Sequence, residues 1–400
     1  MQRSSFLIGG LAAGGLVAAS TPIRALAENA VQLPFANGSR PLVAFPQKRP
    51  LMLLTSRPPQ LETPLAIFNE NVFTPNDAFF VRWHLAGIPT TIDGKAFRIK
   101  IHGLVDNPVE LSVDELRRNY EAVDIAAVCQ CSGNSRGFFE PRVPGGQWGN
   151  GAMGNAHWRG ARLRDVLHHA GIKAGAVQVR LNGMERPVLP ATPDFIKALD
   201  MDVATAPDVI IAYEMNGADL PLLNGFPVRL VVPGYFATYW TKMLDDVEVI
   251  GEPDENFWMK TAYRIPAVKD GCISPGEKTE TKPIGKMPVR SFFTSLSDEE
   301  KIPAGQTRVK GIAFDGGSGI RRVDFSTDGG STWQAAKLST DYGKYGFRQW
   351  DAAFDARAGE TYHLAVRATA NDGAVQPTTK CWNPGGYLMN IIETVTVTAS

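Results

Sequence analysis

A cysteine in a flexible, polar segment is the strongest local signal for chemistry in this chain. The segment Val128–Gly137 reads VCQCSGNSRG, and it places Cys129 and Cys131 among Ser, Gly and Asn residues, with Arg136 close behind. A thiolate is a soft ligand suited to a transition metal, and a nearby guanidinium favours the anionic form of a thiol. Two thiols fall short of the four ligands of a structural zinc site. On this pattern alone, a buried loop cysteine is the simpler interpretation.

An arginine and a histidine alternate in the segment Phe80–Leu85, which reads FVRWHL. If this segment is a strand, Arg82 and His84 point to the same face. A guanidinium offers paired donors to the oxygens of an anion, so the pair predicts an anion site. A surface ion pair beside a buried histidine is the competing interpretation.

A third cluster is the segment 258–264, which reads WMKTAYR. Tyr263 can donate a hydrogen bond to a metal-bound oxygen, and Trp258 can form the wall of a pocket. By itself this cluster fits ordinary amphipathic packing equally well.

Two further patterns predict no site. Gly149, Gly151 and Gly154 spell G-x-G-x-x-G, but no hydrophobic strand leads into them and no βαβ unit surrounds them, so dinucleotide binding is not expected. His168 and His169 fit a helix end on a solvated face. The sequence has no H-E-x-x-H, G-x-S-x-G or P-loop motif, and no Cys-x-x-Cys-His haem attachment site.

The elements that position these residues belong to a chain of 400 residues, of which 44% are hydrophobic and 20% charged. This is a globular composition with room for two domains. The formal net charge is zero, so no global field attracts nucleic acid or a membrane surface, and any anion site must be a local cluster of cations.

The first residues predict an export signal. An apolar run from Ile8 to Ala19 precedes Ala25-Leu26-Ala27, the small-x-small pattern of a signal-peptidase site. We therefore expect a signal peptide over residues 1–27, cleavage after Ala27, and a periplasmic protein. A membrane anchor is the alternative, but the run is shorter than the ~20 residues that a spanning helix needs. Arg3-Ser-Ser-Phe-Leu resembles a twin-arginine signal that lacks its second arginine.

The rest of the chain predicts an α+β domain followed by a β-sandwich. Residues 28 to about 75 are rich in Pro and poor in periodicity, which favours an extended arm. Short strands and a few helices then follow without a regular βαβ rhythm. The expected elements are strands at 97–101, 209–213 and 228–232, a helix N-capped by Ser112 with Glu115 three residues on, and a helix over 163–169.

Residues 266–288 are rich in Pro, Gly and Lys and predict a linker or crossing segment. From residue 289 to 400, about seven short alternating strands over ~110 residues fit an immunoglobulin-like sandwich, with strands at 322–326, 362–368 and 393–398. Cys272 and Cys381 either form a disulfide or are two unrelated thiols; the sequence leaves both open.

Together these segments resemble the sulfite oxidase family of molybdenum enzymes, and most of all its bacterial, periplasmic, cytochrome-linked sulfite dehydrogenases. The resemblance covers nearly the whole mature chain. Its most specific parts are 80–85, 131–136, 148–160, 208–216 and 225–234.

The resemblance implies a molybdenum–molybdopterin cofactor, with no haem in this chain. Cys131 matches the single protein ligand of the metal. The expected catalytic residues are Arg82, His84, Arg136, Trp258 and Tyr263. The expected cofactor-binding residues are Phe80, His84, Asn224, Arg229, Trp240, Thr241 and Lys242. Asn224 departs from the family pattern, because animal members have a histidine there.

The implied domains are a catalytic domain over 28–265 and an immunoglobulin-like domain of the molybdenum-cofactor dimerisation type over 289–400. The implied reaction is oxidation of sulfite to sulfate by oxygen-atom transfer, with the electrons passed to an external c-type cytochrome. One alternative is a sulfoxide reductase of the same superfamily, and another is a non-enzymatic secreted binding protein. A nitrate reductase is less favoured, because no haem or flavin domain is attached.

Overall fold

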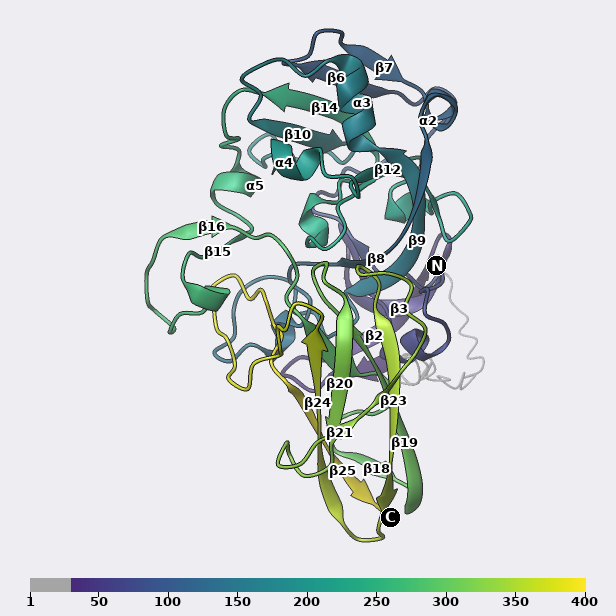
Figure 1. Ribbon diagram of the computed structural model, residues 1–400, viewed down its shortest axis with the longest axis vertical. Coiled ribbons are helices and arrows are strands. Elements are labelled where there is room, and N and C mark those ends of the chain that lie inside the picture. The colour runs from purple at the N-terminus through teal and green to yellow at the C-terminus, as the bar shows by residue number, and fades with distance from the viewer. Residues whose placement is uncertain (1–29) are drawn as a thin grey trace, which may run out of the picture.

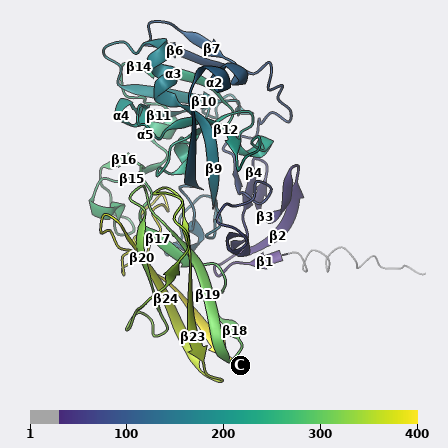
Figure 2. The same ribbon diagram turned by 45° about the vertical axis from the view of Figure 1, so that its right-hand side comes forward.

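The computed structural model describes residues 30–400 (Figure 1). The predicted signal peptide lies outside the described residues. Figures 1 and 2 show an elongated molecule with two sheets at one end, a β-sandwich at the other, and the N-terminal strands beside β9 between them. Among residues 30–400, no helix has the length and apolar character to cross a membrane.

The N-terminal segment forms a sheet, and the prediction of an extended arm over residues 28–75 is wrong. Its antiparallel strands are β1 (Ala30–Gln32), β2 (Ser39–Phe45), β3 (Lys48–Ser56), β4 (Pro59–Glu62) and β5 (Val81–Arg82), in that order across the sheet. The sheet buries Leu51 and Leu61 against Trp83 and Met243. Pro59 is the first residue of its strand, a position that proline tolerates.

Two sheets carry the rest of the predicted catalytic domain. One has the order β11-β10-β14-β6-β7 and the other the order β13-β12-β9-β8. The strands of the first are β6 (Ile99–Gly103), β7 (Val109–Leu111), β10 (Gln178–Gly183), β11 (Lys197–Asp200) and β14 (Leu244–Ile250). Those of the second are β8 (Ala122–Gln130), β9 (Met153–Arg162), β12 (Ile210–Met215) and β13 (Arg229–Val231). The strands expected at 97–101, 209–213 and 228–232 are confirmed within two residues.

The helices are short, and the two that the sequence predicted are present. They are α2 (Val113–Asn119), α3 (Leu163–Ala170), α4 (Met201–Ala204) and α5 (Phe257–Lys260). The 3-10 turns are η1 (Leu65–Asn69), η2 (Arg136–Phe138), η3 (Leu222–Asn224), η4 (Ala237–Tyr239) and η5 (Lys269–Gly271). Ser112 and Glu115 form the expected reciprocal capping box at the start of α2. Strands nevertheless dominate the described residues, so the α+β label stays a prediction.

The C-terminal region is a sandwich of two sheets, with orders β17-β19-β23-β22 and β18-β25-β24-β20-β21. The strands are β17 (Arg290–Phe293), β18 (Glu300–Ile302), β19 (Gly305–Phe314), β20 (Ile320–Ser326), β21 (Gln334–Ala335), β22 (Lys337–Leu338), β23 (Arg348–Ala356), β24 (Thr361–Ala370) and β25 (Glu393–Ala399). Phe293 and Trp350 of one sheet share a buried cluster with Leu364 and Val366 of the other. The sandwich is confirmed, while its immunoglobulin-like character stays a prediction.

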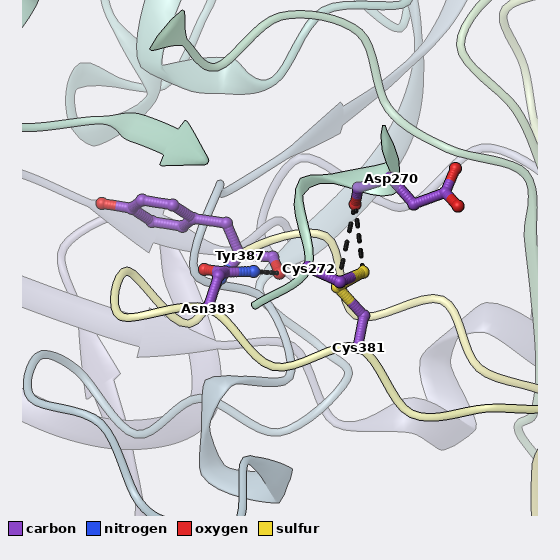
Figure 3. Close-up of a disulfide and its surroundings, with 5 residues drawn as sticks. All are labelled: Asp270, Cys272, Cys381, Asn383 and Tyr387. Atoms are coloured by element: carbon purple, nitrogen blue, oxygen red, sulfur yellow. Dashed lines mark hydrogen bonds between the residues drawn. A yellow bond between two sulfur atoms is a disulfide. The ribbon is translucent and has the colours of Figure 1, made fainter. Parts of the chain in front are cut away.

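The crossing segment 266–288 contains one strand of a β-hairpin and the hairpin's loop, and a disulfide joins it to the C-terminal region. Strands β15 (Arg264–Pro266) and β16 (Thr281–Pro283) pair antiparallel. Cys272 forms a disulfide with Cys381 of the loop between β24 and β25, which settles the pairing that the sequence left open (Figure 3).

Candidate active site

A pocket with about 500 Å³ of empty space brings most of the predicted site residues together. Those that line it are Phe80, Arg82, His84, Cys131, Asn224, Arg229, Trp240, Lys242 and Tyr263. Arg136, Trp258 and Thr241 do not line it. The pocket therefore collects side chains from at least four separate parts of the chain.

Cys131 is placed at the end of β8 by the backbone of its own loop. Its amide donates to the carbonyl oxygen of Ala152 at 2.9 Å, and its carbonyl oxygen accepts from the amide of Asn134 at 3.0 Å. Cys129 lies inside β8 and also reaches the pocket. Both thiols are free. Burial raises the pKa of Cys129, which disfavours its thiolate form.

Three cations face the pocket. Arg229 and Lys242 oppose each other as an isolated antiparallel bridge, and Arg82 comes from β5. The Arg229 guanidinium lies over the rings of Trp158 and Trp240, at 5.2 and 5.7 Å, and donates to the carbonyl oxygen of Asn224 at 3.0 Å. Burial lowers the pKa of Arg229, and it lowers that of Lys242 to about 8. Buried cations are costly unless a negative partner compensates them, so this wall favours an anionic ligand.

His84 and Tyr263 form a hydrogen-bonded pair at one side of the pocket. His84 Nε2 and Tyr263 Oη are 2.5 Å apart, and the donor depends on the tautomer of the imidazole. The pKa of His84 lies well below its usual range because of burial and then the nearby charges of Arg82, Lys242 and Lys197. Burial raises the pKa of Tyr263. The histidine is therefore neutral and the tyrosine protonated at neutral pH.

Trp258 packs behind this pair instead of lining the pocket. Its ring centroid lies 5.2 Å from that of His84, and its Nε1 donates to the carbonyl oxygen of Asp194 at 2.8 Å. Phe195 stacks directly on His84, with ring centroids 3.4 Å apart and planes at 13°. The expectation that Trp258 walls the pocket is therefore corrected: Phe195 takes that place, because its ring covers the imidazole.

Arg136 also lies outside the pocket lining. It opens η2 directly after Ser135, whose φ of 68° turns the chain sharply. Its side chain is buried and donates to backbone carbonyl oxygens, those of Gly146 and Gly385. The sequence indicated that Arg136 is near the cysteine loop but not that carbonyl oxygens hold it. Thr241 is likewise buried behind the lining.

Several residues of the site carried no signal in the sequence. Lys48 of β3 is buried; its Nζ donates to Asn224 Oδ1 and, at 3.0 Å, to the carbonyl oxygen of Phe79. Lys197 of β11 donates to the carbonyl oxygen of Trp258 at 2.7 Å and lies 5.3 Å from the Tyr263 ring. Burial lowers the pKa of each lysine to about 7.

A carboxylate was missed as well. Glu185 is buried and accepts hydrogen bonds from the amides of His84 and Leu85 at 3.0 and 2.9 Å. Its burial raises its pKa, and Lys242 acts in the opposite direction. Glu185 therefore fixes the backbone that presents His84, and a single Glu in a polar loop gives no pattern that would have identified it.

The pocket fits a molybdopterin. Buried polar atoms around it lack a hydrogen-bond partner within residues 30–400: Arg82 Nη1, Ser132 Oγ, Arg229 Nε, Thr238 Oγ1 and Thr241 Oγ1. Unsatisfied buried donors call for a polar, anionic ligand. In the described part of the chain, no three His, Cys, Asp or Glu side chains gather as a metal site. A metal–pterin cofactor brings sulfur ligands of its own, so a single thiolate such as Cys131 suits it.

Comparisons with known proteins agree with this site. Residues 85–258 match the family model "Oxidoreductase molybdopterin binding domain", and residues 281–400 match "Mo-co oxidoreductase dimerisation domain". Mitochondrial sulfite oxidase of Homo sapiens is 33% identical over 391 residues, which is 92% of this chain and 69% of that protein. Sulfite oxidase of Gallus gallus is 32% identical over 87% of this chain and 78% of its own length.

Two further proteins are similar over most of this chain. The nitrate reductase of Hordeum vulgare is 31% identical over 85% of this chain but only 41% of its own length. The crystal structure of the sulfane dehydrogenase SoxCD from Paracoccus pantotrophus superposes with a TM-score of 0.73 at 23% identity, covering 96% of this chain and 93% of that one. The chain therefore belongs to the sulfite oxidase family of molybdenum oxidoreductases, and its cofactor is molybdenum–molybdopterin.

Proposed function

We propose that this chain oxidises sulfite to sulfate and passes the electrons to a c-type cytochrome outside the chain. The observation that carries the proposal is that Arg82, with a buried and unpartnered Nη1, lines the same pocket as the Cys131 thiol. A guanidinium with free donors beside a metal ligand suits a small oxyanion. Sulfite is such an anion, and the relatives of this chain are sulfite oxidases.

The bound cofactor would supply two-electron oxygen-atom transfer, which no side chain can provide. Cys131 would be its thiolate ligand, since soft sulfur donors suit such a metal. Arg229 and Lys242 would hold the anionic part of the pterin, and Asn224, Trp240, Thr241 and Phe80 would shape its binding site. Backbone carbonyl oxygens of Asn224 and Trp240 accept from the Arg229 guanidinium, which also lies over the rings of Trp158 and Trp240, and these contacts keep the cation in place.

The remaining polar residues would handle the substrate. Arg82 would bind the sulfite oxygens by charge-assisted hydrogen bonds, which are stronger than those that a neutral competitor could form. His84 is neutral, so it adds no charge and instead orients Tyr263 through their hydrogen bond. Tyr263 stays protonated and can donate where negative charge develops, which is usually the largest protein contribution. Arg136 lies behind the lining, where carbonyl oxygens hold its guanidinium, and its positive charge acts on Tyr263 from there.

One observation supports an external acceptor. The sequence has no haem attachment motif, so we place the acceptor haem on a second protein. We infer docking around Arg82 and the segment 258–264, where Phe257 next to Trp258 leaves 43% of its surface exposed. Electron-transfer contacts are small and partly polar, and their rates fall with ionic strength when charges steer the encounter. A periplasmic location, which the expected signal peptide implies, is part of this proposal.

The alternative functions make different demands on the pocket. A sulfoxide is neutral, so it would gain less than an oxyanion from the unpartnered Arg82 donor. The membership in an oxidoreductase family argues against a purely adhesive or binding protein. Nitrate is also an oxyanion, and the assay below includes it for that reason.

The test uses the full chain purified with its cofactor. Molybdenum is quantified, and turnover is then measured with sulfite and cytochrome c, with sulfite and oxygen alone, and with nitrate or methionine sulfoxide and a reduced dye. We expect stoichiometric molybdenum and fast sulfite-dependent cytochrome reduction that slows as salt is added. Faster turnover of nitrate or of the sulfoxide would overturn the proposed substrate. Sulfite oxidation with oxygen that no cytochrome accelerates would overturn the proposed acceptor.

A further inference from the structure

A loop of the C-terminal sandwich reaches the arginine behind the pocket. Residues 381–388, called the strap from here on, lie between β24 and β25. Arg136 donates from Nε and Nη2 to the carbonyl oxygen of Gly385, at 3.1 and 3.0 Å. A bidentate contact of this kind fixes the plane of the guanidinium. The direction in which Arg136 points is thus set by a residue 249 positions away in the sequence.

The same strap also contacts the tyrosine of the pocket. Tyr387 is buried and stacks on Tyr263, with ring centroids 5.9 Å apart and planes at 18°. Its ring centroid is also 5.1 Å from the guanidinium carbon of Arg136. One aromatic ring of the second domain therefore packs against both Arg136 and Tyr263, and Tyr263 in turn is hydrogen-bonded to His84.

The strap has a defined shape and little room to move. The Asn383 side chain donates from Nδ2 to the carbonyl oxygen of Tyr387 at 2.8 Å and accepts the Tyr387 amide at 3.1 Å (Figure 3). Gly386 has φ of +60°, and a Cβ there would come within 2.4 Å of Val143 and 2.8 Å of Arg136. Only glycine combines this conformation with such a close approach.

The disulfide ties the strap to the chain segment that leaves Tyr263. Cys381 is the first residue of the strap, and Cys272 lies nine positions after Tyr263 (Figure 3). Next to this bond, the Ile273 amide donates to the carbonyl oxygen of Trp382 at 2.9 Å. Trp382 Nε1 donates at 2.8 Å to the carbonyl oxygen of Pro141, in the loop that follows Arg136. The strap is thus bonded to the segment that follows Tyr263 and to the loop that follows Arg136.

We propose that the strap is a positioning element for the anion site: Gly385 and Tyr387 hold Arg136 and Tyr263 in orientation, and the disulfide keeps the strap seated. The identity of the anion as sulfite rests on the proposed function above. Tyr387 does not line the pocket and would act through Tyr263 and Arg136, the two residues it packs against. The dimerisation-type domain would therefore contribute to substrate affinity.

The kinetic test compares three forms of the full, cofactor-loaded chain. Tyr387→Leu removes the ring, Tyr387→Phe keeps the ring that both contacts use, and Cys272→Ala with Cys381→Ala removes the covalent tie. Tyr362→Leu is the matched control, because its ring packs on Phe354 within the sandwich, away from the strap. We expect the sulfite KM to rise roughly tenfold in Tyr387→Leu and in the double cysteine variant, since a desolvated cation–π contact and its geometry are lost. We expect kcat and molybdenum content to change little, and Tyr387→Phe and Tyr362→Leu to match the wild type.

A second measurement keeps the proposal separate from the identity of the substrate. Hydrogen–deuterium exchange reports backbone opening without any turnover. In Tyr387→Leu and in the double cysteine variant, we expect faster exchange in peptides covering 136–140 and 381–388, with β9 and β12 unchanged. If exchange in 136–140 is unchanged, or if it rises while the KM stays at the wild-type value, the strap does not position the site. If the wild type fails to oxidise sulfite, the proposed function falls, while the exchange result still decides whether the strap orders Arg136.

Discussion

Replacing Arg82 by glutamine tests the anion site at the residue that defines it. The Arg82 Nη1 is buried and has no partner within the described residues, so an incoming anion breaks no internal hydrogen bond to reach it. A hydrogen bond to a charged group contributes about 1.5–3 kcal/mol, and every 1.4 kcal/mol is a factor of ten. We therefore expect the sulfite KM of Arg82→Gln to rise roughly tenfold to a hundredfold, while kcat changes less. Arg82→Lys should fall between the two, because it keeps the charge but loses the planar fork.

The same substitution has a second, independent consequence for His84. The positive charge of Arg82 is the largest cause after burial of the depressed pKa of His84. Removing that charge should raise this pKa, so the acidic limb of the pH profile of kcat/KM should move to higher pH. The assay is steady-state reduction of cytochrome c over a range of pH, with molybdenum content measured for each variant. Arg98→Gln is the control, since Arg98 is exposed and directly precedes β6. An unchanged KM in a fully loaded Arg82→Gln protein would place Arg82 outside the substrate site.

Three other outcomes are expected. Cys131→Ser should fold but lose sulfite turnover, because a hydroxyl is a poor ligand for a soft metal site, whereas Cys129→Ser should be milder; equal activity losses would contradict the ligand assignment. Burial raises the pKa of Glu62 to about 7 from 4.5, so the folded state favours the protonated form of this side chain. As the pH rises from 4.5 through 7, the unfolding free energy of the wild type relative to Glu62→Gln should therefore fall by roughly 3 kcal/mol. Urea denaturation at a series of pH values measures this difference. Ser112→Ala should lower the unfolding free energy by about 1 kcal/mol through loss of the α2 cap, and a change near zero would show that the capping box is dispensable.

Local chemistry explains which elements could be predicted. At the start of α2, the side chains of Ser112 and Glu115 each accept a hydrogen bond from the other residue's amide. The apolar run at 209–213 is buried on both faces of its sheet. Each of these signals lies within a few residues of the sequence. The N-terminal sheet gave no such signal. Its strands show little alternation, and their apolar residues are buried against Trp83 and Met243, which lie outside residues 28–75. Only the tertiary partner makes that segment a sheet.

The site divides in the same way. Cys131, Arg82 and Tyr263 could be predicted because their motifs resemble a known family. Lys48 and Lys197 could not, because a single lysine in an apolar strand looks like a strand edge until the structure shows it buried. Trp258 and Arg136 were expected at the substrate but lie behind the lining, because Phe195 covers His84 and the strap holds the guanidinium.

Two buried side chains of the N-terminal sheet, Lys48 and Glu62, form hydrogen bonds to segments on two sides of the pocket. Lys48 of β3 holds the Asn224 side chain, which lines the pocket beside Arg229. From β4, the Glu62 carboxylate accepts the amides of Gly149 and Gly151 at 3.0 and 2.8 Å, in the segment whose backbone pairs with the Cys131 loop. Burying ionisable side chains such as Lys48 and Glu62 costs free energy, and these hydrogen bonds offset part of that cost. The prediction of an extended arm over residues 28–75 therefore failed in a segment that supports the site. The contacts that give this segment its role are to residues far along the chain, so its own sequence does not reveal them.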